Sequence, residues 1–310
     1  MGIFQMRDED RFCPIPYAER HLQTVEADFF AQVSDQKFHH LEGLCFDRDD
    51  NLYVCHPFNG GEVLRLDMET KEFTHVFNDE GLFPVAVKIH KDGRLFVCCV
   101  GNTKSGRILV MNPDGTDVKV IVEGYAVDDL VFDSKGGFYF TDYRGTIDNR
   151  IGGVYYVYPD YKTVEPVMKN LASPNGIALS KNEHVLWVTE CDTNRLIRYI
   201  LEKPGYQSVP YYFSGYAAPD SCCIDDEDNL YVAMFQQGRI MIFNPLGFPI
   251  GQVLLPNRDK GHNLVSTHPA IRPGTKELYI CSCDDIGEEG ANIFKSESFA
   301  MANTTSYQFR

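Results

Sequence analysis

The sequence contains no long apolar run and is poor in positive charge. None of its apolar stretches reaches the roughly 18 residues that a membrane-spanning helix needs. Its 29 Lys and Arg residues stand against 44 Asp and Glu residues, which gives a net charge of −15. Such a surface repels phosphate backbones and anionic lipids, so we expect neither nucleic acid nor a membrane as a partner. Residues 1–10 lack a basic segment followed by an apolar one, so no secretion signal is expected.

Disulfide bridges are not indicated either, although the chain has ten cysteines. Cys98-Cys99 and Cys222-Cys223 are adjacent pairs, and neighbouring residues of a strand point to opposite faces. Cys281 and Cys283 share a face, but no second pair stands at the spacing of a zinc site. We therefore interpret the cysteines as buried, reduced thiols that act as small apolar side chains. Reduced thiols at this density indicate a cytoplasmic protein.

A repeated pattern runs through most of the chain. A short apolar strand, a polar turn and a second strand of Leu-Tyr-Val character recur six times. The second strands carry large anchor residues at Tyr53, Phe96, Tyr139, Trp187, Tyr231 and Tyr279. A period of roughly 40–50 residues with all-β content is typical of propeller blades. The repeat therefore predicts an all-β protein, a six-bladed β-propeller with four-stranded antiparallel blades.

No linker, low-complexity tract or block of charge interrupts the repeats, so we expect one domain over residues 1–310. The blades are expected near residues 41–78, 84–123, 127–169, 174–214, 219–256 and 266–310. A stretch near residues 23–32 has strand character and no blade of its own. We expect it to join the last blade and close the ring, because closure removes an open sheet edge.

One position of the repeat is rich in oxygen-bearing side chains. The innermost strand of each blade runs along the propeller axis, so the residue that begins it forms a ring around the channel. These ring residues are Glu42, Val85, Asp128, Asn175, Asp220 and Thr267. Three carboxylates gathered in a medium of low dielectric repel one another and raise each other's pKa values, and a bound cation removes that conflict. The alternative is that Asp and Asn residues here only cap turns.

The donor set predicts the kind of cation. With Ser221 beside Asp220, the ring offers oxygen donors only, which favours one hard ion in the central channel. We expect Ca²⁺, with Mg²⁺ or Mn²⁺ as possible substitutes. Asp129, next to Asp128, should point away from the ring and be structural.

Loops that leave the second strands should open at the same end as the ring and wall a pocket above it. The candidates for substrate contact there, and near the last blade, are His56, Tyr143, Arg144, Phe235 and His268. Alternatives remain for each of them. Arg144 could instead pair with Asp142 or Asp148, the aromatic residues could be packing, and a hydrogen-bonded structural histidine would also explain His268.

Several motifs resemble a known family. Leu41-Glu42-Gly43-Leu44, Ser173-Pro174-Asn175-Gly176-Ile177-Ala178 and Pro219-Asp220-Ser221 are similar to the SMP-30/gluconolactonase/LRE family of calcium propellers. Longer stretches, at residues 127–142, 152–157, 219–225, 228–234 and 266–269, resemble one lactonase branch of it. The resemblance implies a Ca²⁺-dependent lactonase whose ion is held by Glu42, Asp128, Asn175, Asp220 and Ser221. It also implies that Asp220 carries the proton chemistry.

Two departures from the family bear on cofactor and substrate. The same lactonase branch holds a second calcium with a loop before the position of Tyr125, and here that loop and the turn at residues 104–106 are shorter. We therefore expect a second ion to be weak or missing. The sugar-lactonase branch has an arginine two residues before the position of Asp128, where this chain has Ala126. Sugar lactones are therefore not the expected substrates.

The reaction expected from these residues is hydrolysis of a lactone ring. A divalent ion would polarise the carbonyl, water would attack it, and Asp220 would move the proton. The sequence has no Gly-x-Ser-x-Gly elbow that could offer a serine nucleophile. The alternatives are a calcium-dependent aryl-ester or phosphotriester hydrolase and a non-catalytic propeller that serves as a binding module. The sequence leaves the particular lactone or ester and the oligomeric state open.

Overall fold

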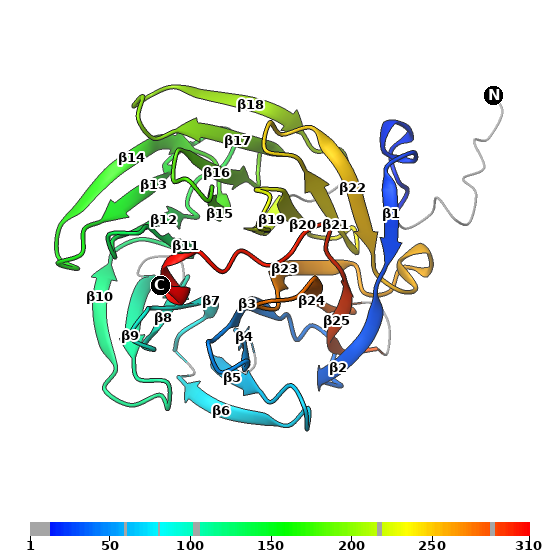
Figure 1. The fold of residues 1–310 in the computed structure, drawn as a ribbon, viewed down its shortest axis with the longest axis horizontal. Helices are drawn as coiled ribbons and strands as arrows, with labels where there is room; N and C mark the ends of the chain where they lie inside the picture. The colour runs from blue at the N-terminus through cyan, green and yellow to red at the C-terminus, as the bar shows by residue number, and fades with distance from the viewer. Residues whose placement is uncertain (1–12, 59–60, 80, 102–105, 216–218, 286–288) are drawn as a thin grey trace.

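Six small sheets are arranged around a central axis in a computed structural model of the chain (Figure 1). The structure describes residues 13–58, 61–79, 81–101, 106–215, 219–285 and 289–310. Each sheet contains four antiparallel strands, and one of them gains a fifth strand. The prediction of a six-bladed β-propeller is thus confirmed.

Within a blade the strands follow one another from the axis outward. The first three blades contain β3 (Glu42–Phe46), β4 (Leu52–His56), β5 (Glu62–Leu66) and β6 (Phe73–Asn78); β7 (Pro84–Ile89), β8 (Leu95–Cys99), β9 (Arg107–Met111) and β10 (Lys119–Glu123); and β11 (Val127–Phe132), β12 (Phe138–Asp142), β13 (Gly152–Val157) and β14 (Val164–Leu171). The next two contain β15 (Pro174–Leu179), β16 (Val185–Glu190), β17 (Arg195–Ile200) and β18 (Gln207–Tyr212); and β19 (Pro219–Ile224), β20 (Leu230–Met234), β21 (Arg239–Phe243) and β22 (Pro249–Leu254). The last has β23 (Val265–Ile271), β24 (Glu277–Cys283) and β25 (Ala291–Glu297).

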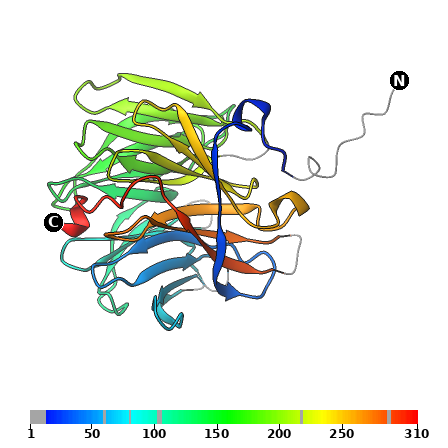
Figure 2. The same cartoon turned by 45° about the vertical axis from the view of Figure 1, so that its right-hand side comes forward.

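The N-terminal region closes the ring in two steps rather than one. Strand β2 (Asp28–Ser34) pairs antiparallel with β25 and becomes the outer strand of the last blade. Strand β1 (Gln23–Glu26) instead pairs parallel with β22 of the fifth blade. Between them, the backbone N–H of Ala27 donates to the carbonyl of Leu254 at 2.9 Å. The expected single strand near residues 23–32 is therefore two strands on two neighbouring blades, and Figure 2 shows them running along the outside of both.

The last blade ends earlier than the sequence suggested. Its own strands stop at Glu297, whereas the expected range extended to residue 310. The segment that follows crosses the inner strands at one end of the channel (Figure 1). Ala302 forms an isolated bridge with Asp225, and the Tyr307 hydroxyl lies 2.9 Å from Nε2 of His90 in the second blade. These contacts join the end of the chain to blades distant in sequence.

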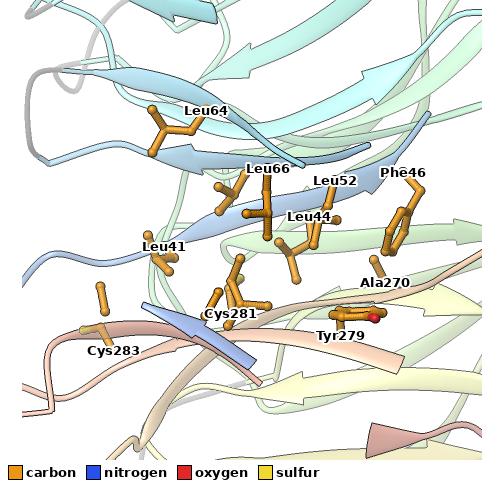
Figure 3. Close-up of a cluster of buried hydrophobic side chains, with 14 of the residues drawn as sticks. Leu41, Leu44, Phe46, Leu52, Leu64, Leu66, Ala270, Tyr279, Cys281 and Cys283 are labelled. Atoms are coloured by element: carbon orange, nitrogen blue, oxygen red, sulfur yellow. The ribbon is translucent and has the colours of Figure 1, made fainter. Parts of the chain in front are cut away.

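The apolar core lies between the blades. Figure 3 shows one such layer, in which Leu44 and Leu52 of the first blade face Tyr279 and Cys281 of the last. The anchor residues on the second strands belong to these layers, and Tyr53, Phe96, Trp187, Tyr231 and Tyr279 are all at most 1 % exposed. Repeated large side chains thus supply the packing between neighbouring sheets, which explains their regular spacing.

The cysteines are part of the same layers. All ten are unpaired, and eight are buried, which agrees with their interpretation as small apolar side chains. Among the described residues, no helix has the length and apolar character that crossing a bilayer requires.

Candidate metal centre and substrate pocket

Every inner strand is irregular where it carries its ring residue. The pairing register shifts between Glu42 and Cys45 in β3, and between Val127 and Leu130 in β11. Corresponding shifts occur in β15, β19, β7 and β23. A β-bulge bends its strand and re-aims the side chain next to it. The bulges therefore explain how side chains at the starts of six strands can face one channel.

Hydroxyl groups connect these bulges from blade to blade. Thr189 Oγ1 accepts the N–H of Gly176 at 2.7 Å and donates to the carbonyl of Asp220 at 2.8 Å. In the same way, Thr141 Oγ1 accepts the N–H of Asp129 at 3.1 Å and donates to the carbonyl of Asn175 at 2.6 Å. Each threonine satisfies two buried backbone groups and fixes the spacing of adjacent ring residues.

Glycine is required where the inner strands approach most closely. A Cβ atom on Gly176 would lie 2.6 Å from the carbonyl oxygen of Asp220 and 2.7 Å from Cα of Ser221. Such distances are below ordinary contact, so only glycine allows β15 to lie so close to β19. Gly43 has φ of +60° and a similar close approach to Ala86 Cα at 2.7 Å. Both glycines directly follow a ring residue.

Five of the six ring residues line one pocket, and the sixth, Thr267, instead donates a hydrogen bond to the carbonyl of Leu41. A cavity of about 700 Å³ is lined by Glu42, Asp128, Asn175 and Asp220 together with Val85. Asp128, Asn175 and Asp220 are 6–9 % exposed, whereas Glu42 is partly exposed. Four oxygen-bearing side chains from four blades thus share one cavity, which we call the hub.

The hub gathers three carboxyl groups, and none of the described residues that line it is a Lys or Arg. Burial, followed by the neighbouring Asp220 and Asp128 carboxylates, raises the pKa of Glu42 well above its usual range. Burial and then Asp220 raise the pKa of Asp128 in the same direction. Burial raises the pKa of Asp220 to about 8, against the opposing effect of hydrogen bonds from the Ser221 N–H and from Asn175. The charged forms of these carboxyl groups are therefore unfavourable without a cation.

Lys88 is a cation near the hub, but it is paired with Asp129. Its Nζ lies 2.9 Å from Asp129 Oδ1, and the Asp129 side chain is fully buried. Asp129 therefore faces Lys88, and this ion pair gives it the structural role that we expected from the sequence.

The residues of the hub fit a hard divalent ion. Asn175 Oδ1 is buried and has no hydrogen-bond partner among the described residues, so an acceptor is left open in the cavity. Three carboxyl groups beside it supply further oxygen atoms, the ligand type that Ca²⁺ and Mg²⁺ prefer. Ser221 is 1 % exposed, and its N–H donates to Asp220 Oδ1 at 3.0 Å. Its place as a fifth ligand remains a prediction.

The five residues suggested for substrate contact fall into two groups. Tyr143 and Phe235 line the cavity. His56, Arg144 and His268 are not among the described residues that line it. The substrate roles of these three remain sequence predictions without a contact to the pocket.

Arg144 is occupied by an ion pair. Its Nε and Nη2 donate to the two Asp142 carboxylate oxygens at 2.8 and 2.5 Å. Its guanidinium also lies 5.7 Å from the centre of the Tyr125 ring. This is the pairing with Asp142 that the sequence left as an alternative.

The two histidines are buried in other contacts. Nδ1 of His56 lies 3.2 Å from Glu62 Oε2, and the residue is 2 % exposed. His268 is 1 % exposed, with Nε2 3.2 Å from Lys88 Nζ. Burial, and then the charge of Lys88, lowers the pKa of His268 well below its usual range. A histidine held neutral in this way acts as a hydrogen-bond acceptor.

Sequence reasoning missed several residues of the pocket wall. These are His40, Phe83, Val100, Gly101 and Asn194, whereas Phe58, Cys191 and Asp192 lie in loops that leave second strands and were expected to wall the pocket. Asn194 follows the second strand β16, so the rule that pointed to Tyr143 and Phe235 also covers it. His40 and Phe83 precede inner strands, and no pattern in the sequence distinguishes them.

Comparison with known proteins agrees with this architecture. The sequence profile of the SMP-30/Gluconolactonase/LRE-like region matches residues 121–284. The chain belongs to the SMP-30/gluconolactonase/LRE family. It is 50 % identical over 312 residues to Lactonase drp35 of Staphylococcus saprophyticus, covering 97 % of this chain and 95 % of that one. Lactonase drp35 of Staphylococcus aureus strain MRSA252 is 49 % identical over 304 residues, covering 94 % and 93 % of the two chains.

A solved structure shares the fold of this chain although the sequence identity is low. The calcium-binding protein regucalcin from Agrobacterium tumefaciens superposes with a TM-score of 0.71 at 14 % identity, covering 90 % of this chain and 98 % of that one. At this identity the likeness concerns the fold.

Proposed function

We propose that this protein is a Ca²⁺-dependent lactonase that hydrolyses small-molecule lactones. The observation that carries the proposal is the hub, where three carboxyl groups share one cavity with an amide oxygen that has no hydrogen-bond partner in the described part of the chain. Relatives about half identical over nearly the whole chain are called lactonases, which supports the same chemistry. The excess of buried, unpaired thiols supports a cytoplasmic location.

Glu42, Asp128, Asn175 and Asp220 would hold the ion, with Ser221 beside them. When bound, a divalent ion supplies polarisation of the ester carbonyl and stabilises negative charge that develops on its oxygen. Mg²⁺ or Mn²⁺ could replace Ca²⁺ because both also take oxygen ligands.

Asp220 would move the proton. Its Oδ1 accepts the Ser221 N–H at 3.0 Å, which fixes the orientation of the carboxyl group. The other oxygen would accept a proton from the attacking water and return it to the alkoxide that leaves when the ring opens. Water and lactone thereby become one hydroxy acid, with no proton gained or lost by the protein.

The pocket wall favours a lactone with an apolar substituent. Phe58, Phe83, Val100, Tyr143 and Phe235 contribute apolar surface to the cavity. Arg144 is held by Asp142, and residue 126 is alanine, so neither offers a cation for sugar hydroxyl groups. Polyhydroxylated lactones would therefore be poor substrates.

A substrate panel tests this function. Initial rates with lactones, aryl acetates and phosphotriesters should be measured with Ca²⁺ and with excess EDTA. We expect the highest kcat/KM for lactones, at least a 100-fold loss with chelator and recovery with added Ca²⁺. Faster turnover of aryl esters or phosphotriesters would assign the alternative hydrolase activity. Absence of turnover with all three classes of substrate would instead favour the non-catalytic binding module.

A further inference from the structure

We propose that His40, Cys283 and Asp285 form a second metal site, selective for a borderline transition ion such as Zn²⁺, on the wall of the pocket. Among the described residues, this is the one group of three His, Cys, Asp or Glu side chains whose ligand atoms all lie within 4.8 Å of one another. The hub carboxylates are spaced more widely. The site is independent of the lactonase proposal.

The distances within this triad are close to those of a tetrahedral centre. His40 Nε2 lies 3.1 Å from Asp285 Oδ1, and Cys283 Sγ lies 3.1 Å from the same oxygen. A zinc ion with bonds of about 2.0–2.3 Å separates its ligands by about 3.3–3.8 Å. These two pairs therefore need to move apart by only a few tenths of an ångström to accept the ion, and the His40 and Cys283 ligand atoms lie within 4.8 Å of each other.

The fold holds the three ligands from two adjacent blades. Cys283 ends β24 of the last blade, Asp285 follows it, and His40 stands just before β3 of the first. The His40 ring is in edge contact with Phe58 and Phe235, with centroid distances of 5.5 and 5.9 Å. The ring is thus oriented by packing rather than by the ion, as a preformed site requires.

The donor set separates this site from the hub. A nitrogen, a sulfur and one carboxylate suit Zn²⁺, whereas the hub offers oxygen only. Three protein ligands leave a fourth position open, and His40 itself lines the cavity. That fourth position can therefore hold water or a small ligand at the pocket.

Binding has a defined proton balance. Burial and the hydrogen bond to Asp285 raise the pKa of the Cys283 thiol, so the metal-free thiol keeps its proton. Coordination of M²⁺ forms the metal–sulfur bond and releases this one proton to solvent, while the neutral His40 ring exchanges its Nε2 proton for one on Nδ1 so that Nε2 can bind the ion without a net change. The thiolate and the Asp285 carboxylate then balance the charge of the ion.

Cobalt provides a direct test in the full-length protein. With Ca²⁺ present to occupy the hub, Co²⁺ titration should yield one equivalent with a thiolate-to-metal charge-transfer band and tetrahedral d–d bands. Zn²⁺ should displace it. Cys283→Ser should abolish the charge-transfer band, and Asp285→Asn should weaken Co²⁺ affinity at least tenfold.

The control is Cys223→Ser, which removes a partly exposed thiol near the C-terminal segment and should leave the spectrum unchanged. Asp285 is only partly buried, so we expect Asp285→Asn to fold and to test the site even where Cys283→Ser does not fold. Absence of the charge-transfer band in the parent protein would overturn the site. A band that persists in Cys283→Ser, or a Co²⁺ affinity that Asp285→Asn leaves unchanged, would do so as well.

Discussion

At the scale of single residues, Asp220 occupies an environment unlike that of any solvent-exposed aspartate. It is 6 % exposed, its Oδ1 accepts the Ser221 N–H, and burial raises its pKa to about 8. Nearby Asp226 is exposed and pairs with Lys181. The two carboxyl groups belong to the same blade, so they form a matched pair for mutation.

Asp220→Asn should abolish lactone turnover while the protein still binds Ca²⁺. The amide cannot accept the proton from water, and loss of such a group lowers the rate by roughly 10²–10⁴-fold. The expected result is a fall in kcat of at least 100-fold, measured with a lactone that the parent hydrolyses. Asp226→Asn should retain the parent rate, and Ca²⁺ titration should show that both variants bind the ion. An Asp220→Asn enzyme with parent kcat would disprove the assignment.

At the scale of elements, the inner strands position the site through their bulges and close contacts. Thr141 and Thr189 each satisfy backbone groups of two blades, and Gly176 permits β15 to touch β19. The hub residues are thus held in place by hydrogen bonds and close contacts between blades. A change in strand spacing should therefore lower both the free energy of unfolding and the affinity for the ion.

Gly176→Ala tests this coupling. Its Cβ would lie 2.6–2.8 Å from three backbone atoms of residues 220–222, and backbone cannot move aside as a flexible side chain can. Overpacking of this kind costs about 1–3 kcal/mol, so the free energy of unfolding should fall by that amount in urea denaturation. Ca²⁺ affinity should fall as well.

Gly81→Ala is the matched control. Gly81 is exposed, and an added Cβ would meet only a side-chain oxygen of Asp79 at 3.3 Å. Its stability should remain within about 0.5 kcal/mol of the parent. If Gly176→Ala were equally well tolerated, the close contact between β15 and β19 would not restrain the hub.

At the scale of the whole molecule, the raised pKa values of the hub carboxyl groups should make stability depend on pH and on added Ca²⁺. Burial raises the folded-state pKa of Asp220 to about 8, and it also raises those of Glu42 and Asp128. In the unfolded chain such groups titrate near pH 4, at about 3.9 for Asp and 4.3 for Glu. The metal-free folded state therefore holds more protons than the unfolded state between about pH 4 and pH 8.

The Tm of the chelated protein should consequently fall as the pH rises from 5 to 8. Added Ca²⁺ should raise Tm more at pH 8 than at pH 5, because at low pH protons compete with the ion. Differential scanning calorimetry with EDTA and with Ca²⁺ measures both effects. A chelated Tm that is constant or rises over this range would contradict the charge arrangement of the hub. Asp128→Asn, which removes one of the three carboxylates, should flatten the decline.

The C-terminal segment also links distant parts of the molecule. The Tyr307 hydroxyl lies 2.9 Å from His90 Nε2 in a buried contact between the end of the chain and the second blade. Tyr307→Phe should lower the free energy of unfolding by about 0.5–1.5 kcal/mol in urea denaturation. Tyr17→Phe, at a 77 % exposed position, should have no measurable effect. Equal stability of all three proteins would show that this contact does not help to hold the C-terminal segment on the second blade.

The parts of the structure that the sequence predicted are those that repeat. Tyr53 and Tyr279 stand at equivalent places in their blades because each blade must bury the same face against its neighbour. The shared cavity around Asp128 and Asp220 follows from the same periodicity. The path of residues 23–34 was only partly predictable, because one short strand can pair with either of two neighbouring sheet edges.

The sequence by itself therefore determined the six blades and the set of oxygen donors that begins their inner strands, since a repeated pattern encodes each sheet locally. Only the tertiary structure decided which loop side chains are available to a substrate. His268 contacts Lys88, which is 180 residues away in the sequence, and Arg144 donates a hydrogen bond to Asp142. The direction of a polar side chain depends on the partners that distant blades bring to it, and such pairings leave no period in the sequence.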